Sequence, residues 1–158
     1  MIEYYTGDPH QIQHFVKVHS FAKLIAEQEG ASGELLWIIE AAALVHDIGI
    51  KTAIKQYGRS SGDLQEKLGP PEAEELLSDL NFKHSLIERV CYLVGHHHTY
   101  DNIDGLDYQI LVEADFLVNI HESNYNGDAI QKVNENIFKT KTGKTFLKKM
   151  FLDKQGLS

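Results

Sequence analysis

The residues best suited to chemistry are the adjacent pair His46 and Asp47, which end the apolar run 41–45. Burying an imidazole or a carboxylate at the end of such a run costs free energy unless a partner compensates. A divalent cation would compensate, because neutral imidazole and carboxylate are both good metal ligands. A His-Asp pair is common by itself, so the prediction of a metal site depends on partners elsewhere in the chain.

Asp115 is the first such partner. It shares one face of a predicted helix with Leu111 and Val118, and that face is apolar. A carboxylate in this position binds a metal, caps a neighbouring helix or pairs with a buried lysine. The residue pattern alone leaves these three alternatives open.

His14 is the second partner, on the apolar side of the predicted first helix beside Val18 and Ala22. A lone histidine at such a site is more often a hydrogen-bonded core residue than a ligand. His10 and His19 lie nearby and compete with it. Since His19 points about 140° away from His14 around a helix, both cannot reach one site.

A third feature is the run His96-His97-His98 near the end of a predicted helix. Three adjacent imidazoles cannot all face one metal from a helix, but one or two could face inward. The alternative is an exposed polar helix end.

Two other features carry no predicted chemistry. Gly143-Lys144-Thr145 is similar to the end of a phosphate-binding P-loop, but that motif needs a glycine where Phe138 stands, and no strand precedes it. The single cysteine, Cys91, has no motif around it, and we expect it to pack on its helix.

The elements that must position these residues are predicted to be helices throughout, because prolines are few and apolar residues recur with a period near 3.6. Asp8-Pro9 is typical of a helix start. Residues 51–69 are polar and predict little regular structure, and Pro70-Pro71 is predicted to begin the next helix. The predicted helices cover residues 9 to about 30, 33–45, 70 onward, 84–96, 106–122, a segment ending near 138, and 145–152.

Composition predicts one globular domain. The chain has 158 residues, of which 42% are hydrophobic and 24% charged, as in ordinary soluble proteins. It has no apolar stretch near the roughly 20 residues of a membrane span, and Met1–Tyr5 shows no signal-peptide pattern. One cysteine excludes an internal disulfide, which suits a reducing cytoplasm. We therefore expect a cytoplasmic protein without membrane association.

Charge is unevenly spread along the chain. The net charge is −8, but residues 129–158 carry +5, which leaves −13 on residues 1–128. The basic segment contains Lys132, Lys139, Lys141, Lys144, Lys148, Lys149 and Lys154, and it is more typical of a solvated helix face than of an anion site. The acidic body argues against a stable nucleic-acid complex. It also means that an anionic substrate needs a local positive centre such as a metal.

Taken together, these residues resemble the HD-domain superfamily of metal-dependent phosphohydrolases. The family's first motif is a histidine on a helix with small or aliphatic residues at four-residue intervals, and the second is a His-Asp pair. The third is an aspartate in a phrase like Ala-Asp-x-Leu. The matching residues are His14, Val18, Ala22, Ala26 and Gly30, then His46-Asp47-Ile48-Gly49 as in HDIG members, then Ala114-Asp115-Phe116-Leu117. The resemblance covers residues 8–122 and is more specific to the superfamily than to a substrate.

The chain departs from members of the family that bind two metals. Those members add a histidine in a His-Gly-Pro-x-x-Ala phrase and another in a His-His pair. The pair is matched by His97-His98, but Leu68 stands in place of the other histidine. We therefore expect one tightly held cation and regard a second as doubtful, with Glu66 as a candidate replacement ligand.

The resemblance implies an all-α, single-domain helical bundle over residues 1–158, with its core at 8–122 and a C-terminal helical extension at 126–158. It implies a divalent metal held by His14, His46, Asp47 and Asp115. Imidazole and carboxylate ligands suit Mn, Fe, Co, Ni or Zn better than Mg. A water on the open side of such a metal could attack phosphorus.

The resemblance also implies roles for further residues. Asp47, His97 and His98 are expected to be catalytic, and His97, His98 and Lys51 to contact the substrate phosphate. For Lys51 a solvated side chain is an equal alternative. The expected substrate is a small phosphate ester, with a nucleotide favoured. A metal-bearing sensor without catalysis and a purely structural metal remain alternatives, and a homodimer is compatible with the sequence.

Overall fold

The computed structural model describes residues 1–153, and its regular elements are all helical. This confirms the predicted all-α class. The helices are α1 (Pro9–Gln28), α2 (Gly33–Val45), α3 (Ile50–Tyr57), α4 (Gly62–Asp79), α5 (His84–Val94), α6 (Leu106–Glu122), α7 (Gly127–Asn136), α8 (Lys141–Leu147) and a π-helical turn, η1 (Lys148–Leu152). Lys154, counted in the basic segment, lies outside the described residues.

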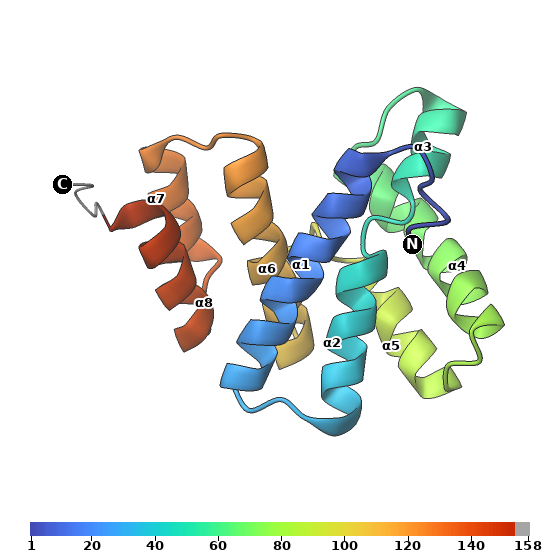
Figure 1. The fold of residues 1–158 in the computed structure, drawn as a ribbon, viewed down its shortest axis with the longest axis horizontal. Helices are drawn as coiled ribbons and strands as arrows, with labels where there is room; N and C mark the ends of the chain where they lie inside the picture. The colour runs from blue at the N-terminus through green and yellow to red at the C-terminus, as the bar shows by residue number, and fades with distance from the viewer. Residues whose placement is uncertain (154–158) are drawn as a thin grey trace.

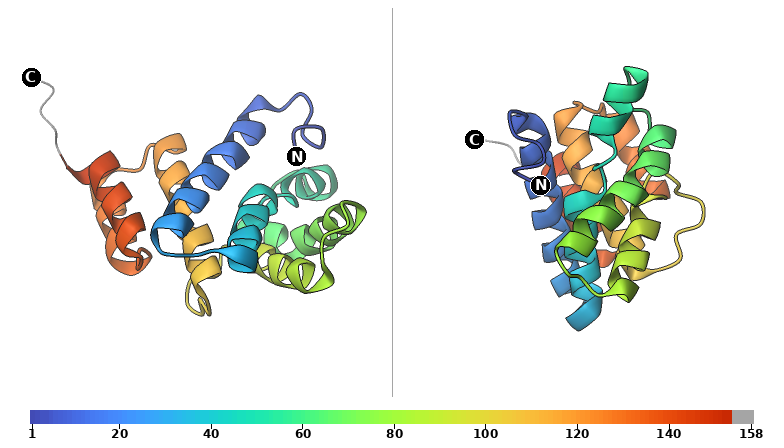
Figure 2. Two further views of the ribbon diagram at one scale, coloured as in Figure 1. Left: turned by 60° about the horizontal axis from the view of Figure 1, so that its bottom comes forward. Right: turned by 90° about the vertical axis from the view of Figure 1, so that its right-hand side faces the viewer.

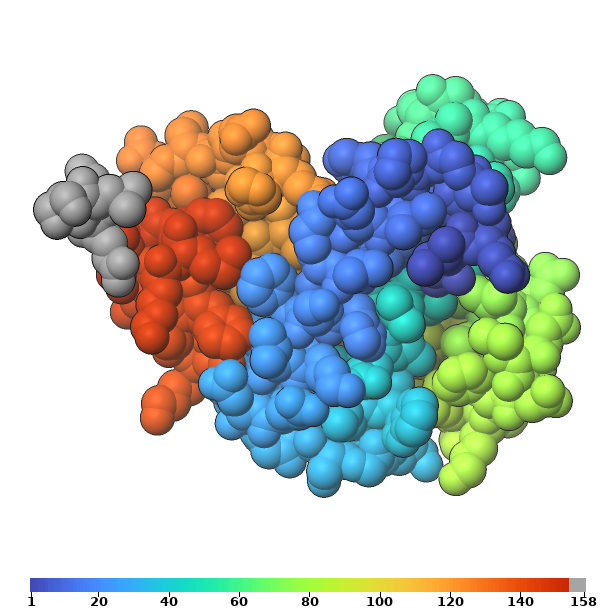
Figure 3. All heavy atoms as spheres, in the orientation of Figure 1, coloured from blue at the N-terminus to red at the C-terminus, as the bar shows by residue number. Residues whose placement is uncertain are grey.

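Helices α1, α2 and α6 form the centre of the bundle (Figure 1). α1 packs on α2 and α6, and α2 also contacts α5 and α6. α4 packs on α5 and α3, while α7 and α8 lie at the opposite end of the molecule (Figures 1 and 2). α1 crosses the middle of the face shown in Figure 3. Within residues 1–153, no helix is both long enough and apolar enough to cross a membrane.

Local sequence explains the central helices. The Asp8 side chain accepts a hydrogen bond from the Gln11 backbone N–H at 3.0 Å, and Pro9 occupies the first turn, so α1 begins as predicted. In α6, every residue from 107 to 118 except Phe116 is buried. A helix that is buried on nearly all sides must lie in the interior of the bundle, and α6 therefore carries its polar residues into the core.

The prediction for residues 51–69 was wrong. They form α3 and the first part of α4, and Pro70 and Pro71 lie inside α4 rather than at its start. In α4 the apolar periodicity is weak because its inward-facing side includes Gln65 and Gly69 beside Leu64. These positions are polar or small, so a search for apolar spacing misses the helix.

Gly49 has no side chain because α4 crosses very close to the turn after α2, and Gly69 has none because α4 also lies against Val94 of α5. A Cβ atom added at Gly49 would lie 2.7 Å from the Gly69 nitrogen, and one added at Gly69 would lie 2.6 Å from Val94 Cγ1. Real Cβ atoms do not approach other atoms so closely. The glycine that follows His46-Asp47-Ile48 thus lets α4 approach the pair and brings Gln65 to the same end of the bundle.

The C-terminal helices are attached to α6 through a fully buried carboxylate, Glu113. Its Oε1 accepts hydrogen bonds from Gln109 Nε2 at 2.7 Å and from the backbone N–H groups of Lys139 and Thr140 at 2.6 Å and 2.9 Å. The Thr140 hydroxyl donates to Oε2 and also caps α8. The last helix therefore begins at Lys141, four residues earlier than predicted. A buried charge with this many donors is well compensated.

Gly143 is required by this carboxylate rather than by any phosphate. A Cβ atom at Gly143 would overlap Glu113 Oε2 and lie 2.8 Å from Thr140 Oγ1. We expect Gly143→Ala to destabilise the protein by about 2 kcal/mol, as overpacking of a tight interior does. Thermal unfolding should then show a midpoint lowered by roughly 4–8 °C.

Gly127→Ala is the matched control, because a Cβ atom at Gly127 would have no heavy atom within 4 Å. That variant should unfold at the temperature of the wild type or slightly above it. Equal midpoints for both variants would show that the Glu113 cluster tolerates a methyl group.

Candidate metal centre

Four side chains meet in the interior. His14 comes from α1, His46 and Asp47 from the turn that directly follows α2, and Asp115 from the middle of α6. The two Nε2 atoms of His14 and His46 are 3.4 Å apart. Asp115 Oδ1 lies 3.3 Å from Nε2 of His14 and 3.5 Å from that of His46. Asp47 Oδ2 lies 3.5 Å from each of the same two nitrogens. All four residues are buried.

Hydrogen bonds assign the ring protons of the two histidines. His14 Nδ1 is 2.9 Å from Glu122 Oε2, and His46 Nδ1 is 3.0 Å from the carbonyl oxygen of Ala43. Because both oxygens can only accept, each Nδ1 must carry a proton. In the neutral rings both Nε2 atoms then present lone pairs to each other and to the carboxylates. Two imidazole lone pairs and two carboxylates then face one another with no positive charge between them.

Asp115 supplies a further sign of a missing cation. Its Oδ1 is buried, and its nearest neighbours are the Nε2 atoms of His14 and His46, so while both rings are neutral and protonated at Nδ1 it has no donor among the described residues. Buried polar atoms without partners are rare, because they cost about 1–3 kcal/mol each. A divalent ion between this oxygen and the two Nε2 atoms would remove that cost.

The local field favours positive charge. Burial alone would lower the pKa of His14, but the carboxylates of Asp115, Asp47 and Glu122 outweigh it and raise that pKa to about 9. The pKa of His46 is also raised, against its burial, by Asp47 and Asp115. Burial would raise the pKa of Asp115, but the two histidines hold it below its usual range. The centre is therefore stabilised by a cation, which a metal can supply in place of ring protons.

Residues around the four ligand candidates orient them. Glu122 accepts hydrogen bonds from the His14 ring through Oε2 and from Lys17 Nζ through Oε1, the latter at 2.6 Å. Gln11 Nε2 lies 3.4 Å from Asp47 Oδ2, and the buried Tyr5 hydroxyl donates to the Asp47 carbonyl at 3.1 Å. Sequence reasoning missed these partners. Glu122 stands seven residues after Asp115, two helical turns along the same face, and that spacing was the available signal.

Of the three adjacent histidines, two face the centre. His97 is buried, and its Nε2 lies 3.2 Å from Asp47 Oδ1. The His98 ring lies beside it, with ring centroids 4.1 Å apart. Burial and the neighbouring His97 lower the pKa of His98 to about 4, so it is neutral at pH 7. His96 instead stacks on Tyr92 at 4.2 Å.

The turn that carries these histidines is fixed from both sides. Glu66 Oε1 accepts hydrogen bonds from the His98 backbone N–H at 2.9 Å and from Thr99 Oγ1 at 3.0 Å. The buried Tyr108 hydroxyl contacts the carbonyl oxygens of His96 and Thr99. Glu66, considered as a replacement metal ligand, therefore uses one carboxylate oxygen to hold this turn.

A cavity of about 260 Å³ opens over the cluster. Its lining comes from α1, α3, α4, α6 and the adjoining turns, and it comprises His10, Gln11, His14, Asp47, Ile50, Gln65, His98, Asp115, Asn119, Glu122 and Ser123. Lys51 is not brought to it, because its ammonium donates to the Tyr4 carbonyl at 2.8 Å. His19 also lies elsewhere, 3.8 Å from Glu40.

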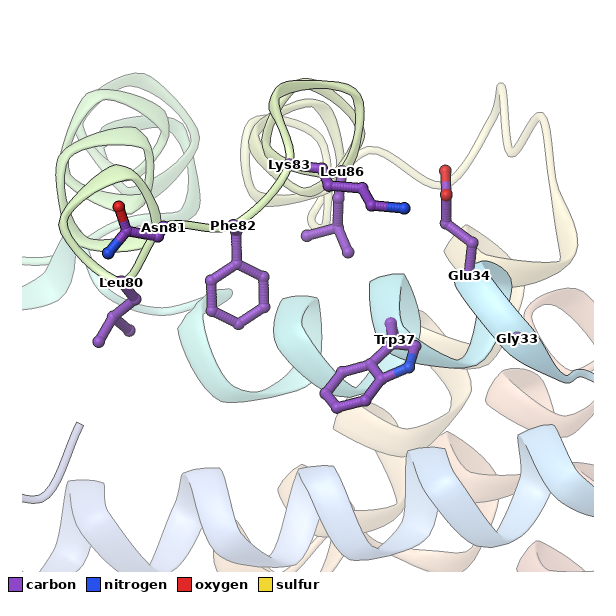
Figure 4. Close-up of a pocket in the computed structure, with 8 residues that line it drawn as sticks. All are labelled: Gly33, Glu34, Trp37, Leu80, Asn81, Phe82, Lys83 and Leu86. Atoms are coloured by element: carbon purple, nitrogen blue, oxygen red, sulfur yellow. The ribbon is translucent and has the colours of Figure 1, made fainter.

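A larger hollow of about 580 Å³ lies between the start of α2 and the α4–α5 turn (Figure 4). It is lined by Trp37, Leu80, Phe82 and Leu86 with Glu34, Asn81 and Lys83 at its edge, and it contains none of the histidines or aspartates of the cluster. The polar cavity is therefore the better candidate for chemistry, despite its smaller size.

Glu122 gives the first prediction about this centre. Outer hydrogen-bond partners of ligand histidines typically contribute 10–100-fold to metal affinity. We expect Glu122→Ala to weaken metal binding by about that factor in a calorimetric titration, because His14 loses the acceptor that fixes its Nδ1 proton.

Lys17→Ala is the control, since Lys17 touches the same carboxylate and its side chain is 39% exposed. An exposed pair contributes at most about 1 kcal/mol, so its affinity should stay within about fivefold of the wild type. Equal affinities for Glu122→Ala and the wild type would mean that His14 is not oriented by this contact.

Two comparisons with known proteins found a match. The HD domain family matches residues 12–138, which include all four clustered side chains. The crystal structure of a predicted HD superfamily hydrolase from an uncultured Thermotogales bacterium is similar, with a TM-score of 0.66 and 25% sequence identity. The alignment covers 93% of this chain and 78% of the other. Comparison with curated proteins finds no match. The fold and the extent of the family match show that this chain belongs to the HD domain family.

Proposed function

We propose that this protein is a metal-dependent phosphohydrolase that acts on a small phosphate ester, with a nucleotide as the favoured class. The observation that carries the proposal is the convergence of two imidazole lone pairs and two carboxylates, one of them with an unsatisfied oxygen, below a polar cavity. Such a group of ligands at the base of a cavity leaves one side open to a substrate.

The residues present fit a divalent metal ion. His14 and His46 would each offer Nε2, and Asp47 and Asp115 would each offer a carboxylate oxygen. Two nitrogen and two oxygen ligands suit Mn, Fe, Co, Ni or Zn better than Mg, which prefers oxygen. When bound, the ion supplies Lewis acidity, which acidifies a water nucleophile and offsets charge on phosphoryl oxygens.

The chain's own residues would orient the substrate and move protons. Asp47 connects the metal ligands to His97, because its Oδ2 faces His14 and His46 and its Oδ1 faces His97. His97 Nδ1 donates to the Val94 carbonyl at 2.8 Å, so its Nε2 is free to take up a proton. His98 lines the cavity and is placed to contact a phosphate.

The size and charge of the cavity support a small substrate. A volume of about 260 Å³ is slightly below the roughly 300–1,000 Å³ of typical ligand pockets. It can hold a phosphoryl group and the adjacent part of its alcohol. The acidic body of the chain, −13 over residues 1–128, also disfavours a polynucleotide.

The second candidate function is a metal-bearing sensor that binds a phosphorylated ligand without hydrolysing it. The observation that favours it is the composition of the cavity lining, which has three carboxylates and, among the described residues, neither lysine nor arginine. Such a lining would give a phosphate dianion little electrostatic attraction beyond that of the metal.

A hydrolysis screen separates these functions. Purified protein would be loaded in turn with Mn, Co, Ni and Zn, and phosphate release would be measured from a panel of nucleotides and other phosphate esters. The proposal expects metal-dependent release from at least one nucleotide. Saturable, metal-dependent nucleotide binding without release would support the sensor, and failure to bind any of these metals would refute both.

A further inference from the structure

Tyr100 lies beside the centre, and no motif singles it out. It stands two residues after His98, and its hydroxyl lies 3.5 Å from Nδ1 of the His98 ring. That ring lines the polar cavity. Tyr100 is 39% exposed, so part of its side chain is open to a ligand on the His98 side of the cavity.

The Tyr100 ring is held in place by α6. Its centroid lies 5.3 Å from that of Phe116, which directly follows Asp115 in the chain. Burial and the Asp115 carboxylate raise the pKa of Tyr100 above its usual value, so the hydroxyl keeps its proton at neutral pH. The ring position and the retained proton together make Tyr100 a placed hydrogen-bond donor.

The segment that carries Tyr100 is fixed on both sides. The Thr99 hydroxyl donates to Glu66 Oε1 at 3.0 Å, and the Tyr108 hydroxyl contacts the Thr99 carbonyl oxygen. Further along, Arg89 donates two hydrogen bonds to Asp104, at 2.8 Å and 3.1 Å. A donor on such a fixed segment loses little conformational freedom when a ligand binds, so the contact can contribute to affinity.

The Tyr100 hydroxyl has no close acceptor within residues 1–153. An O–H group usually lies about 2.5–3.0 Å from its acceptor, and the contact with His98 is longer than that. Two buried tyrosines near the centre differ, because the Tyr5 hydroxyl faces the Asp47 and Ile48 carbonyl oxygens and the Tyr108 hydroxyl faces those of His96 and Thr99. Tyr100 therefore has a proton to donate to a ligand.

A phosphate in this cavity needs uncharged donors. The lining has three carboxylates and, in the described part of the chain, no lysine or arginine. Two amides of the lining are already turned to other acceptors, since Gln11 Nε2 faces Asp47 Oδ2 and Gln65 Nε2 faces the Ser60 carbonyl oxygen. Hydroxyl groups are among the few polar groups that typically fix a ligand in a pocket.

We propose that Tyr100 is a substrate-binding residue whose hydroxyl donates a hydrogen bond to a phosphoryl oxygen. The proposal rests on the proposed function and adds a residue to it. It places the phosphate on the His98 side of the cavity. Because the contact is made to the substrate alone, the affinity for metal does not depend on it.

The test is Tyr100→Phe, which keeps the ring that packs on Phe116 and removes only the hydroxyl. Inorganic phosphate is the probe, titrated calorimetrically into Co²⁺-loaded or Mn²⁺-loaded protein. Hydrogen bonds to charged groups are the stronger ones, so we expect the affinity for phosphate to fall about 10–100-fold. The affinity for the metal itself should equal that of the wild type.

Tyr57→Phe is the matched control, because Tyr57 is 51% exposed on α3 and is absent from the cavity lining. It should bind phosphate as the wild type does. Unchanged phosphate affinity in Tyr100→Phe, weaker metal binding in that variant, or a wild type that binds metal but not phosphate would each overturn the proposal. A wild type that binds no metal would instead refute the proposed function itself, so the two failures are distinguishable.

Discussion

Asp47→Ala is expected to remove bound metal and hydrolysis together. Its Oδ2 is one of the four ligand atoms and its Oδ1 contacts His97. The substitution therefore removes a metal ligand and the contact to His97 together. Changes in outer partners alone typically cost 10–100-fold, and loss of a ligand should therefore lower turnover by more than about 100-fold. His46→Ala should behave alike, because it removes a fully buried Nε2. Metal content and steady-state rates measure both effects.

His19→Ala is the control for both variants. His19 lies on the same helix as His14 but faces Glu40, and its loss should leave the metal content unchanged. Wild-type metal content in folded Asp47→Ala and His46→Ala would place the site elsewhere. Loss of metal in His19→Ala together with its retention in His14→Ala would show that the helical register is wrong.

The second large effect is expected from the paired substitution of His97 and His98 by alanine. General acid–base catalysis and phosphate positioning by histidine typically contribute 10²–10⁴-fold. We expect turnover to fall within about that range while one metal ion per chain remains bound, because neither residue belongs to the group of four ligands. Rates and elemental analysis of the double variant check both parts.

His96→Ala provides the comparison, since His96 is the adjacent imidazole and stacks on Tyr92 instead of facing the cavity. Its turnover should stay close to that of the wild type. Two tightly bound ions in the wild type, with one lost in the double variant, would contradict the mononuclear account.

The sequence predicted the helices that have a regular apolar face. The bounds predicted for α2 and α6 agree with the structure, because both helices are buried by apolar residues at helical spacing. α3 and the first half of α4 were missed. α3 is only eight residues long, with Ala53 as its one buried residue. The inward side of α4 carries Gln65, which lines the cavity, and Gly69, which lies against Val94, and such residues carry no apolar signal.

The four candidate ligands were predictable because a histidine or aspartate on an apolar face stands out. Their supporting contacts were not. Glu122 and His14 are 108 residues apart in the chain, and Gln65 and His98 are 33 apart. Only the packing of α1 against α6, and of α4 against α5, brings such pairs together. For Lys51, sequence position predicted a contact that the structure does not show. Its place after the His-Asp pair predicted a phosphate contact, whereas its ammonium donates a hydrogen bond to the Tyr4 carbonyl.

Anomalous X-ray diffraction from crystals of protein loaded with Mn²⁺, Co²⁺ or Zn²⁺ tests the central claim most directly. It locates the ion without relying on activity. The account predicts one strong peak per chain within about 2.0–2.3 Å of His14 Nε2, His46 Nε2 and the carboxylates of Asp47 and Asp115. No peak among these four residues, or a single peak bound by His97 and His98, would contradict it.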